Sequence, residues 1–220
     1  MKKQPIVGID LGTTFSALAA LDENGKSSIV SCGGHRITPS CIVGPKAEPG
    51  TLYVGDEAKQ LISLECKEGF ICQHFKRDMG SDKSYTSSSG DVTLTPAEAS
   101  SKVLLKLVQE ASKTLGEIDE VVITVPAQFS EKQRKATMEA GRLAGLTVNH
   151  IINEPTAAAL AFATQQDVSG KILIYDLGGG TFDVTIAQVS GQNVDVLTSE
   201  GDPDLGGVDF DLKIAGMVDD

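Results

Sequence analysis

Two stretches that lie far apart in the chain carry the same pattern, IVGIDLGTTFS at residues 6–16 and IYDLGGGTFDVTI at residues 174–186. In each stretch an apolar strand ends in an aspartate, Asp10 or Asp176, and a glycine-containing turn leads into a second strand. The second copy has one extra glycine. A repeat at this distance is not a solenoid period. It predicts two similar lobes, each built on the same strand–turn–strand.

The composition indicates a globular protein with an acidic surface. The chain has 220 residues, 40% of them hydrophobic, and a formal net charge of −11. Such a surface repels phosphate backbones, so we expect neither a nucleic acid nor a membrane as partner. The four cysteines have no Cys-x-x-Cys spacing. They favour buried or half-exposed free thiols in a reducing cytoplasm, although a Cys66–Cys72 bridge stays open.

Between the two copies the chain alternates between strands and helices. The β-branched run at residues 120–125 predicts a strand buried on both faces, and Ser130 begins a helix with a capping box. A short strand at 148–152 then precedes an Ala-rich helix with Pro155 in its first turn. This order is typical of an α/β domain with parallel pairs in its sheet.

The segment before this region is less regular. Residues 33–55 are rich in Gly and Pro and predict irregular structure, with a helix after Asp56. The polar stretch at residues 81–90 predicts an exposed loop. Thr95 then begins a helix as its N-cap, with an apolar stripe along one face, and Gly116 ends it.

The two repeated turns are suited to binding phosphate. Closely spaced backbone N–H groups and small side chains form anion-binding concavities, and a carboxylate beside each turn is placed to hold hydrated Mg²⁺. Either turn alone is equally consistent with an ordinary tight hairpin, but a matched pair is not. The chain has neither a P-loop nor a Gly-x-Gly-x-x-Gly turn after a strand.

Two further residues are candidates for the same site, and each also has a simple structural interpretation. Glu154, at the start of the Ala-rich helix, either complements the helix dipole or orients a water for in-line attack. Lys76 is by itself most simply a solvated surface lysine.

Six motifs together resemble the nucleotide-binding domain of the seventy-kilodalton heat-shock chaperone (DnaK-like) family. They are IVGIDLGTTFS, RITPS, VVITVPAQFSEKQRKAT, INEPTAAALAFA, IYDLGGGTFDVTI and GDPDLGGVDFD. The resemblance covers almost the whole chain. It implies the α/β actin-like (ribonuclease H-like) ATPase fold, with two lobes and ATP in the cleft, which agrees with the repeat.

The resemblance also implies a role for each matching residue. The ATP phosphate loops correspond to Gly12, Thr13, Thr14 and Phe15 and to Gly178, Gly179, Gly180 and Thr181. The carboxylates that arrange Mg²⁺, its waters and K⁺ correspond to Asp10, Asp176 and Asp183. The catalytic set corresponds to Lys76, which reaches the γ-phosphate, Glu154, near the attacking water, and Asp10, Asp176 and Thr181. The pair that relays nucleotide state to the other domain corresponds to Pro126 and Arg134.

The chain departs from the family in two places. The stretch between Lys76 and Pro96 is shorter than in the common members, as in specialised bacterial ones. We expect a complete lobe I over residues 1–169, with a smaller inserted subdomain at about 38–110. Residues 170–220 would supply only the first strands of lobe II, without the segment that grips adenosine.

The expected function is binding and hydrolysis of ATP to ADP and phosphate, with Mg²⁺ and K⁺, in a cytoplasmic heat-shock-type chaperone. In the full protein the expected partners are unfolded polypeptides, a J-domain co-chaperone and a nucleotide-exchange factor. Two alternatives stay open. One is a non-catalytic module of the same fold that pairs into a homodimer, and the other is a small-molecule kinase of the superfamily.

Overall fold

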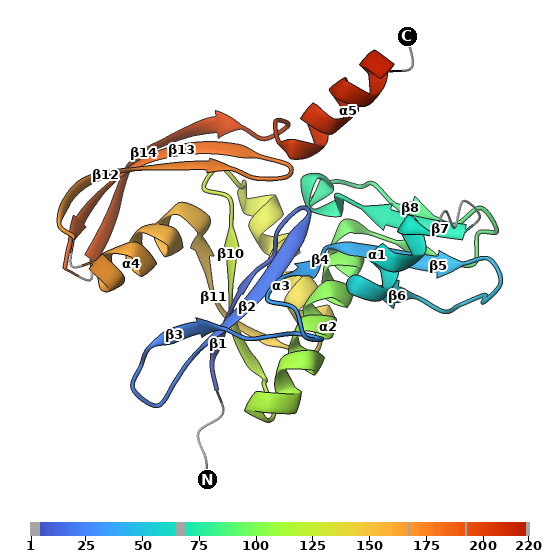
Figure 1. Cartoon of the computed structure of the whole chain (residues 1–220), viewed down its shortest axis with the longest axis horizontal. Coiled ribbons are helices and arrows are strands. Elements are labelled where there is room, and N and C mark those ends of the chain that lie inside the picture. The colour runs from blue at the N-terminus through green and yellow to red at the C-terminus, as the bar shows by residue number, and fades with distance from the viewer. Residues whose placement is uncertain (1–4, 65–68, 167, 192, 219–220) are drawn as a thin grey trace. The chain divides into compact units, whose positions relative to one another are not determined.

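The chain has mixed α/β structure, as predicted, and it divides into two compact units. The computed structural model describes residues 5–64, 69–166, 168–191 and 193–218. Unit 1 comprises Met1–Ile123 and Glu131–Ile151, and unit 2 comprises Thr124–Ser130 and Ile152–Asp220. Figure 1 shows the elements of each unit in chain order.

The largest sheet has the strand order β11-β10-β1-β2-β3, with β4 also pairing with β2. Its strands are β1 (Val7–Asp10), β2 (Phe15–Leu21), β3 (Ser27–Ile29), β4 (Thr38–Pro39), β10 (Glu120–Val125) and β11 (Thr147–Asn153). β1 and β2 are antiparallel, with Ile9 opposite Leu18, and both side chains are almost fully buried. β10 buries alternate residues, so the prediction that both of its faces are fully buried is only partly correct.

Two helices of unit 1 pack against each other and cover this core, α2 (Pro96–Leu115) and α3 (Glu131–Leu143). α2 begins with the predicted capping box, in which Thr95 Oγ1 accepts from the Glu98 N–H and the Glu98 side chain accepts from the Thr95 N–H. Its predicted apolar face is buried around Leu104 and Leu107, and Gly116 is its C-cap, as predicted.

The predicted irregular and loop segments contain short strands. β5 (Cys41–Pro45) pairs with β6 (Tyr53–Val54) and β7 (Gly69–Gln73), and β8 (Tyr85–Thr86) pairs with β9 (Thr93–Leu94). α1 (Asp56–Ser63) begins where predicted, and a 3-10 helix, η1 (Phe75–Asp78), follows β7. The strands were missed because they are short and β5 is stabilised by pairing with β7, which is distant in the sequence.

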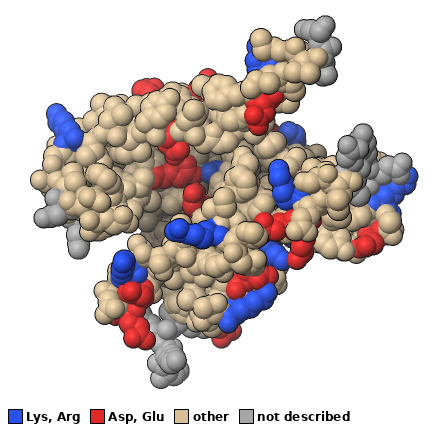
Figure 2. Space-filling model, in the orientation of Figure 1, with Lys and Arg blue, Asp and Glu red and all other residues tan. Residues whose placement is uncertain are grey.

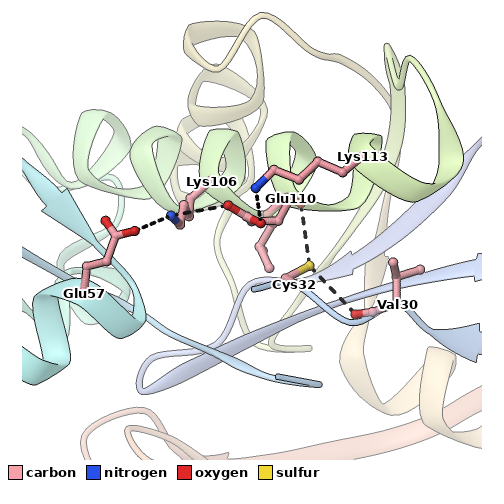
Figure 3. Close-up of polar contacts among 7 residues, drawn as sticks. Val30, Cys32, Glu57, Lys106, Glu110 and Lys113 are labelled. Carbon is pink, nitrogen blue, oxygen red and sulfur yellow. Dashed lines mark hydrogen bonds and ion pairs between the residues drawn. The ribbon is translucent and has the colours of Figure 1, made fainter. Parts of the chain in front are cut away.

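Polar contacts join α1 to α2 in this part of unit 1 (Figure 3). Lys106 Nζ lies 3.1 Å from Glu57 Oε1 on α1 and 3.5 Å from Glu110 Oε1 on its own helix. Lys113 Nζ lies 2.6 Å from Glu110 Oε2, and this contact is the main cause of the lowered pKa of Glu110. Cys32 Sγ donates to the Leu107 carbonyl at 3.6 Å.

The described cysteines Cys32, Cys41 and Cys72 are buried free thiols, in line with the prediction. Cys66, and with it the bridge to Cys72 left open above, lies outside the described residues. In the described parts of the chain, no helix is long and apolar enough to cross a membrane.

Unit 2 is built on a three-stranded antiparallel sheet. Its strands are β12 (Gly170–Leu177), β13 (Phe182–Ser190) and β14 (Asn193–Asp202). α4 (Glu154–Gln166) packs against all three strands and buries Pro155, Ala159 and Ala163. The sequence did not predict α5 (Gly207–Val218), a helix without any buried residue among those described.

Candidate functional site

The first repeated turn joins β1 to β2 in unit 1. It comprises the four residues that follow Asp10. The Cα of Asp10 lies opposite that of Ala17, and the Asp10 side chain is exposed. A Cβ added at Gly12 would lie 2.0 Å from the carbonyl oxygen of Phe15, so the turn excludes any side chain there. The Gly12 N–H donates to Ser16 Oγ at 3.2 Å.

A hydrogen-bonded pair of serines supports this turn, and the hydroxyl of Thr14 beside it has no partner among the described residues. Ser16 Oγ lies 2.9 Å from Ser40 Oγ, and the Ser40 N–H donates to the Thr14 carbonyl at 2.8 Å. Thr14 Oγ1 is buried and makes no hydrogen bond to any of the described residues. A buried hydroxyl without a partner is costly to the folded state. Thr13 is also buried, whereas Phe15 is 44% exposed.

Lys76 belongs to the same unit and is connected to this turn by the small sheet. Ser40, which supports the turn, directly precedes β5, and Cys41 of β5 lies opposite Gln73 at the end of β7. β7 leads into η1, where Lys76 is only 6% exposed. The interpretation of Lys76 as a solvated surface residue is therefore wrong. Arg134 lies on α3, also in unit 1.

The second repeated turn joins β12 to β13 in unit 2, and the first residues of α5 form hydrogen bonds with it. The Gly178 N–H donates to the Thr181 carbonyl at 3.0 Å. The N–H groups of Gly207 and Val208 donate to the carbonyls of Gly178 and Gly179, both at 3.0 Å. These bonds fix the backbone of the turn from outside the hairpin.

Gly206, which sequence reasoning noted only as part of a motif, packs closely against the second turn. A Cβ added there would lie 2.5 Å from the Gly179 carbonyl carbon and 2.5 Å from the Gly180 nitrogen. Only a glycine lets the chain approach the turn this closely. The paired glycines in GDPDLGGVDFD were the available signal, but their contact with the turn is not local in sequence.

Two candidate carboxylates of unit 2 lie side by side. Asp176 of β12 and Asp183 of β13 are opposite each other in the antiparallel ladder, and Asp183 is 5% exposed. The register also shows where the extra glycine takes effect. Asp10 and Ala17 are as far apart in sequence as Asp176 and Asp183, so the extra glycine does not lengthen the second turn. It shifts the strand that follows by one residue.

The remaining candidates are placed as follows. Glu154 is the first residue of α4, and Pro126 directly follows β10; both belong to unit 2. Among the described residues, no three His, Cys, Asp or Glu side chains form a set that could ligate a metal directly.

Comparison with known proteins identifies the family. A family model described as Hsp70 protein matches residues 6–89 and 81–219. The chain belongs to the Hsp70 family. It is also 41% identical, over its whole length, to the chaperone protein DnaK of Halobacterium salinarum, of which it covers 34%. This Hsp70 chain thus spans about a third of the length of that relative.

Proposed function

We propose that this chain is an ATP-binding and ATP-hydrolysing portion of a heat-shock chaperone. The observation that carries the proposal is the pair of glycine turns, one in each unit, each following a strand that brings an aspartate to it. Membership of the Hsp70 family supports the same function. The proposed fold is the actin-like ATPase fold, with lobe I over residues 1–169 and the first part of lobe II over 170–220.

Both turns would bind the phosphates of the nucleotide through backbone N–H groups. At Gly12 the Phe15 carbonyl oxygen occupies the place of a side chain, so only glycine allows the tight turn that brings successive N–H groups together. Thr14 Oγ1 is a buried hydroxyl without a partner in the described structure, and a phosphate oxygen would satisfy it. The residues that we assign to phosphate binding are Gly12, Thr13, Thr14, Phe15, Gly178, Gly179, Gly180 and Thr181.

Asp10, Asp176 and Asp183 would hold Mg²⁺ through its waters, with K⁺ nearby. Asp176 and Asp183 fit this role because like charges opposite each other in a sheet are unfavourable unless a cation lies close. When bound, Mg²⁺ neutralises charge that develops on the phosphates.

Hydrolysis would depend on positioning more than on covalent chemistry. Lys76 would donate to the γ-phosphate, Thr181 would lie close to it, and Glu154 would orient the attacking water. Glu154 stands at the N-terminus of α4, where the helix dipole favours the carboxylate form. Lys76 lies on the four-residue helix η1, and Glu154 is the first residue of the 13-residue helix α4.

The functions of the whole protein are part of the same proposal. Pro126 and Arg134 would relay nucleotide state toward a peptide-binding domain, with unfolded polypeptides, a J-domain co-chaperone and an exchange factor as partners. The buried free thiols favour a reducing compartment such as the cytoplasm. On the face drawn in Figure 2, Lys and Arg side chains are scattered among neutral and acidic ones.

Calorimetric titration of the chain with Mg-ATP and Mg-ADP tests the proposal. We expect saturable binding that Asp10→Asn weakens, and slow release of phosphate from ATP in a single-turnover assay. Binding unchanged in Asp10→Asn, or no heat from a sample with native circular dichroism, would overturn it.

A second candidate function, a non-catalytic module that forms a homodimer, is favoured by one observation. β12 leaves Leu173 and Tyr175 both 64% exposed on one face of its sheet, and α5 exposes Leu212 and Ile214. Apolar surface of this kind favours association. Sedimentation equilibrium would show a dimer that Tyr175→Lys dissociates, whereas a monomer at high concentration would exclude this candidate.

A further inference from the structure

The element that carries Lys76 is short and conformationally strained. η1 has four residues, and its N-cap His74 has a φ of 57°, a left-handed conformation that no other described residue except glycine adopts. Non-glycine residues in this conformation persist only where the surrounding structure holds them. A 3-10 helix of this length has too few internal bonds to keep its shape alone.

The last residue of this helix, Asp78, is bound by two side chains from beyond it. The Tyr85 hydroxyl donates to Asp78 Oδ2, and Lys83 Nζ lies 2.6 Å from the same oxygen. Lys83 Nζ also lies 5.1 Å from the centre of the Tyr85 ring. One carboxylate oxygen therefore ties η1 to β8.

The tyrosine is itself fixed and stays a hydrogen-bond donor. Its ring packs against the core cluster that includes Phe75, the first residue of η1. Burial, followed by the hydrogen bond to Asp78, raises the pKa of Tyr85. The hydroxyl consequently keeps its proton over the whole neutral range.

Close packing also fixes this segment. Met79 is 3% exposed, and a Cβ added at Gly80 would lie 3.1 Å from the backbone of Lys132 and Gln133 on α3. The Asp78 contacts and this packing thus hold the chain just after Lys76. Burial of Lys76 restricts its side-chain rotamers, and this costs conformational entropy.

We propose that Asp78 and Tyr85 are positioning residues for Lys76, because their hydrogen bond fixes the 3-10 helix in the conformation in which the lysine meets the terminal phosphate of ATP. This inference rests on the proposed function. Its consequence is selective: loss of the bond weakens contacts with the γ-phosphate, which ATP has and ADP lacks. A merely structural bond would affect both nucleotides alike.

The test compares four variants. Tyr85→Phe removes only the hydroxyl, Asp78→Ala removes the acceptor, and Asp78→Asn keeps an acceptor oxygen. Thr86→Val is the matched control, because Thr86 Oγ1 bonds Thr93 Oγ1 at 3.1 Å within the same hairpin and does not reach η1. The readouts are the acylation rate of the Lys76 amine in the nucleotide-free chain, by mass spectrometry, and the ratio of Mg-ATP to Mg-ADP affinity.

We expect Tyr85→Phe and Asp78→Ala each to lower ATP affinity about tenfold, as for the loss of one charged hydrogen bond, with ADP affinity unchanged. Acylation of Lys76 should rise several-fold in both, while Asp78→Asn and Thr86→Val behave as the wild type. Unchanged acylation and an unchanged ATP-to-ADP ratio would overturn the inference and leave the proposed function standing. A wild-type chain that binds neither nucleotide would overturn the proposed function and this inference with it.

Discussion

Asp176 and Asp183 lie directly opposite each other on neighbouring strands, and the equivalent position opposite Asp10 in the first repeat is Ala17. The two copies of the turn thus have the same length but different charge. Two adjacent carboxylates in one ladder concentrate negative charge where only a cation or a hydrogen-bonded neighbour relieves it. The second turn therefore has one more carboxylate beside it in the ladder than the first.

Asp183→Asn should separate stability from binding. Removal of one of two facing charges should raise the free energy of unfolding of the nucleotide-free chain by up to about 1 kcal/mol. The affinity for Mg-ATP should fall about tenfold, a change of about 1.4 kcal/mol. Thermal unfolding with and without Mg-ATP measures both effects. Asp195→Asn is the control, because Asp195 is exposed and faces Gln188; equal effects of the two substitutions would contradict the assignment.

Gly206→Ala should disturb the second turn without unfolding the sheet. The new methyl group would collide with the backbone of Gly179 and Gly180, which must then move. We expect at least a tenfold loss of Mg-ATP affinity. Gly216→Ala, in helix α5, which begins directly after Gly206, adds its methyl group to open space and should leave the affinity unchanged. Calorimetry on the two variants makes the comparison, and indistinguishable affinities would argue against a role for this contact.

Thr14→Val should change stability and affinity in opposite directions. Valine has nearly the shape of threonine, and the substitution removes a buried hydroxyl that no described residue satisfies. The nucleotide-free chain should gain about 1 kcal/mol in free energy of unfolding, whereas Mg-ATP should bind more weakly. Urea unfolding and calorimetry measure the two changes. A variant that is destabilised and binds normally would show that the hydroxyl has a structural partner instead.

Stability should decline in alkali because of buried thiols. Burial raises the pKa of Cys72 from about 9 to about 12 and that of Cys41 to about 11. Since the folded-state pKa is the higher one, the contribution to stability is complete below about pH 9 and is lost as the pH rises through the folded value. Each thiol should contribute a slope of about 1.4 kcal/mol per pH unit in that window. Urea unfolding between pH 8 and pH 10.5 should show a shallower decline in Cys72→Ala; parallel curves would contradict this explanation.

Local patterns predicted some elements to the residue. The strand at Glu120–Val125 and the cap at Thr95 depend on β-branching and capping chemistry within a few residues. Motif resemblance identified the family, and the comparisons confirmed it.

Other features depend on contacts between distant residues. β5 was missed because its main partner, β7, lies far along the chain. α5 was missed because it has no buried face among the described residues, and a buried face is what produces a recognisable apolar stripe in a sequence. Burial of Lys76 and the support of the second turn by Gly206 also arise only when distant segments meet. The roles assigned to the candidate site residues stay predictions.

The most direct test of the proposed phosphate site is calorimetric titration of Mg-ATP into Gly12→Ala and Gly8→Ala. A methyl group at Gly12 would collide with the Phe15 carbonyl, whereas one at Gly8, on the strand that leads to the same turn, meets no atom within 4 Å. The account predicts that Gly12→Ala loses Mg-ATP binding while Gly8→Ala binds as the wild type does. Full binding by a folded Gly12→Ala chain would contradict the claim that this turn holds the phosphates of ATP.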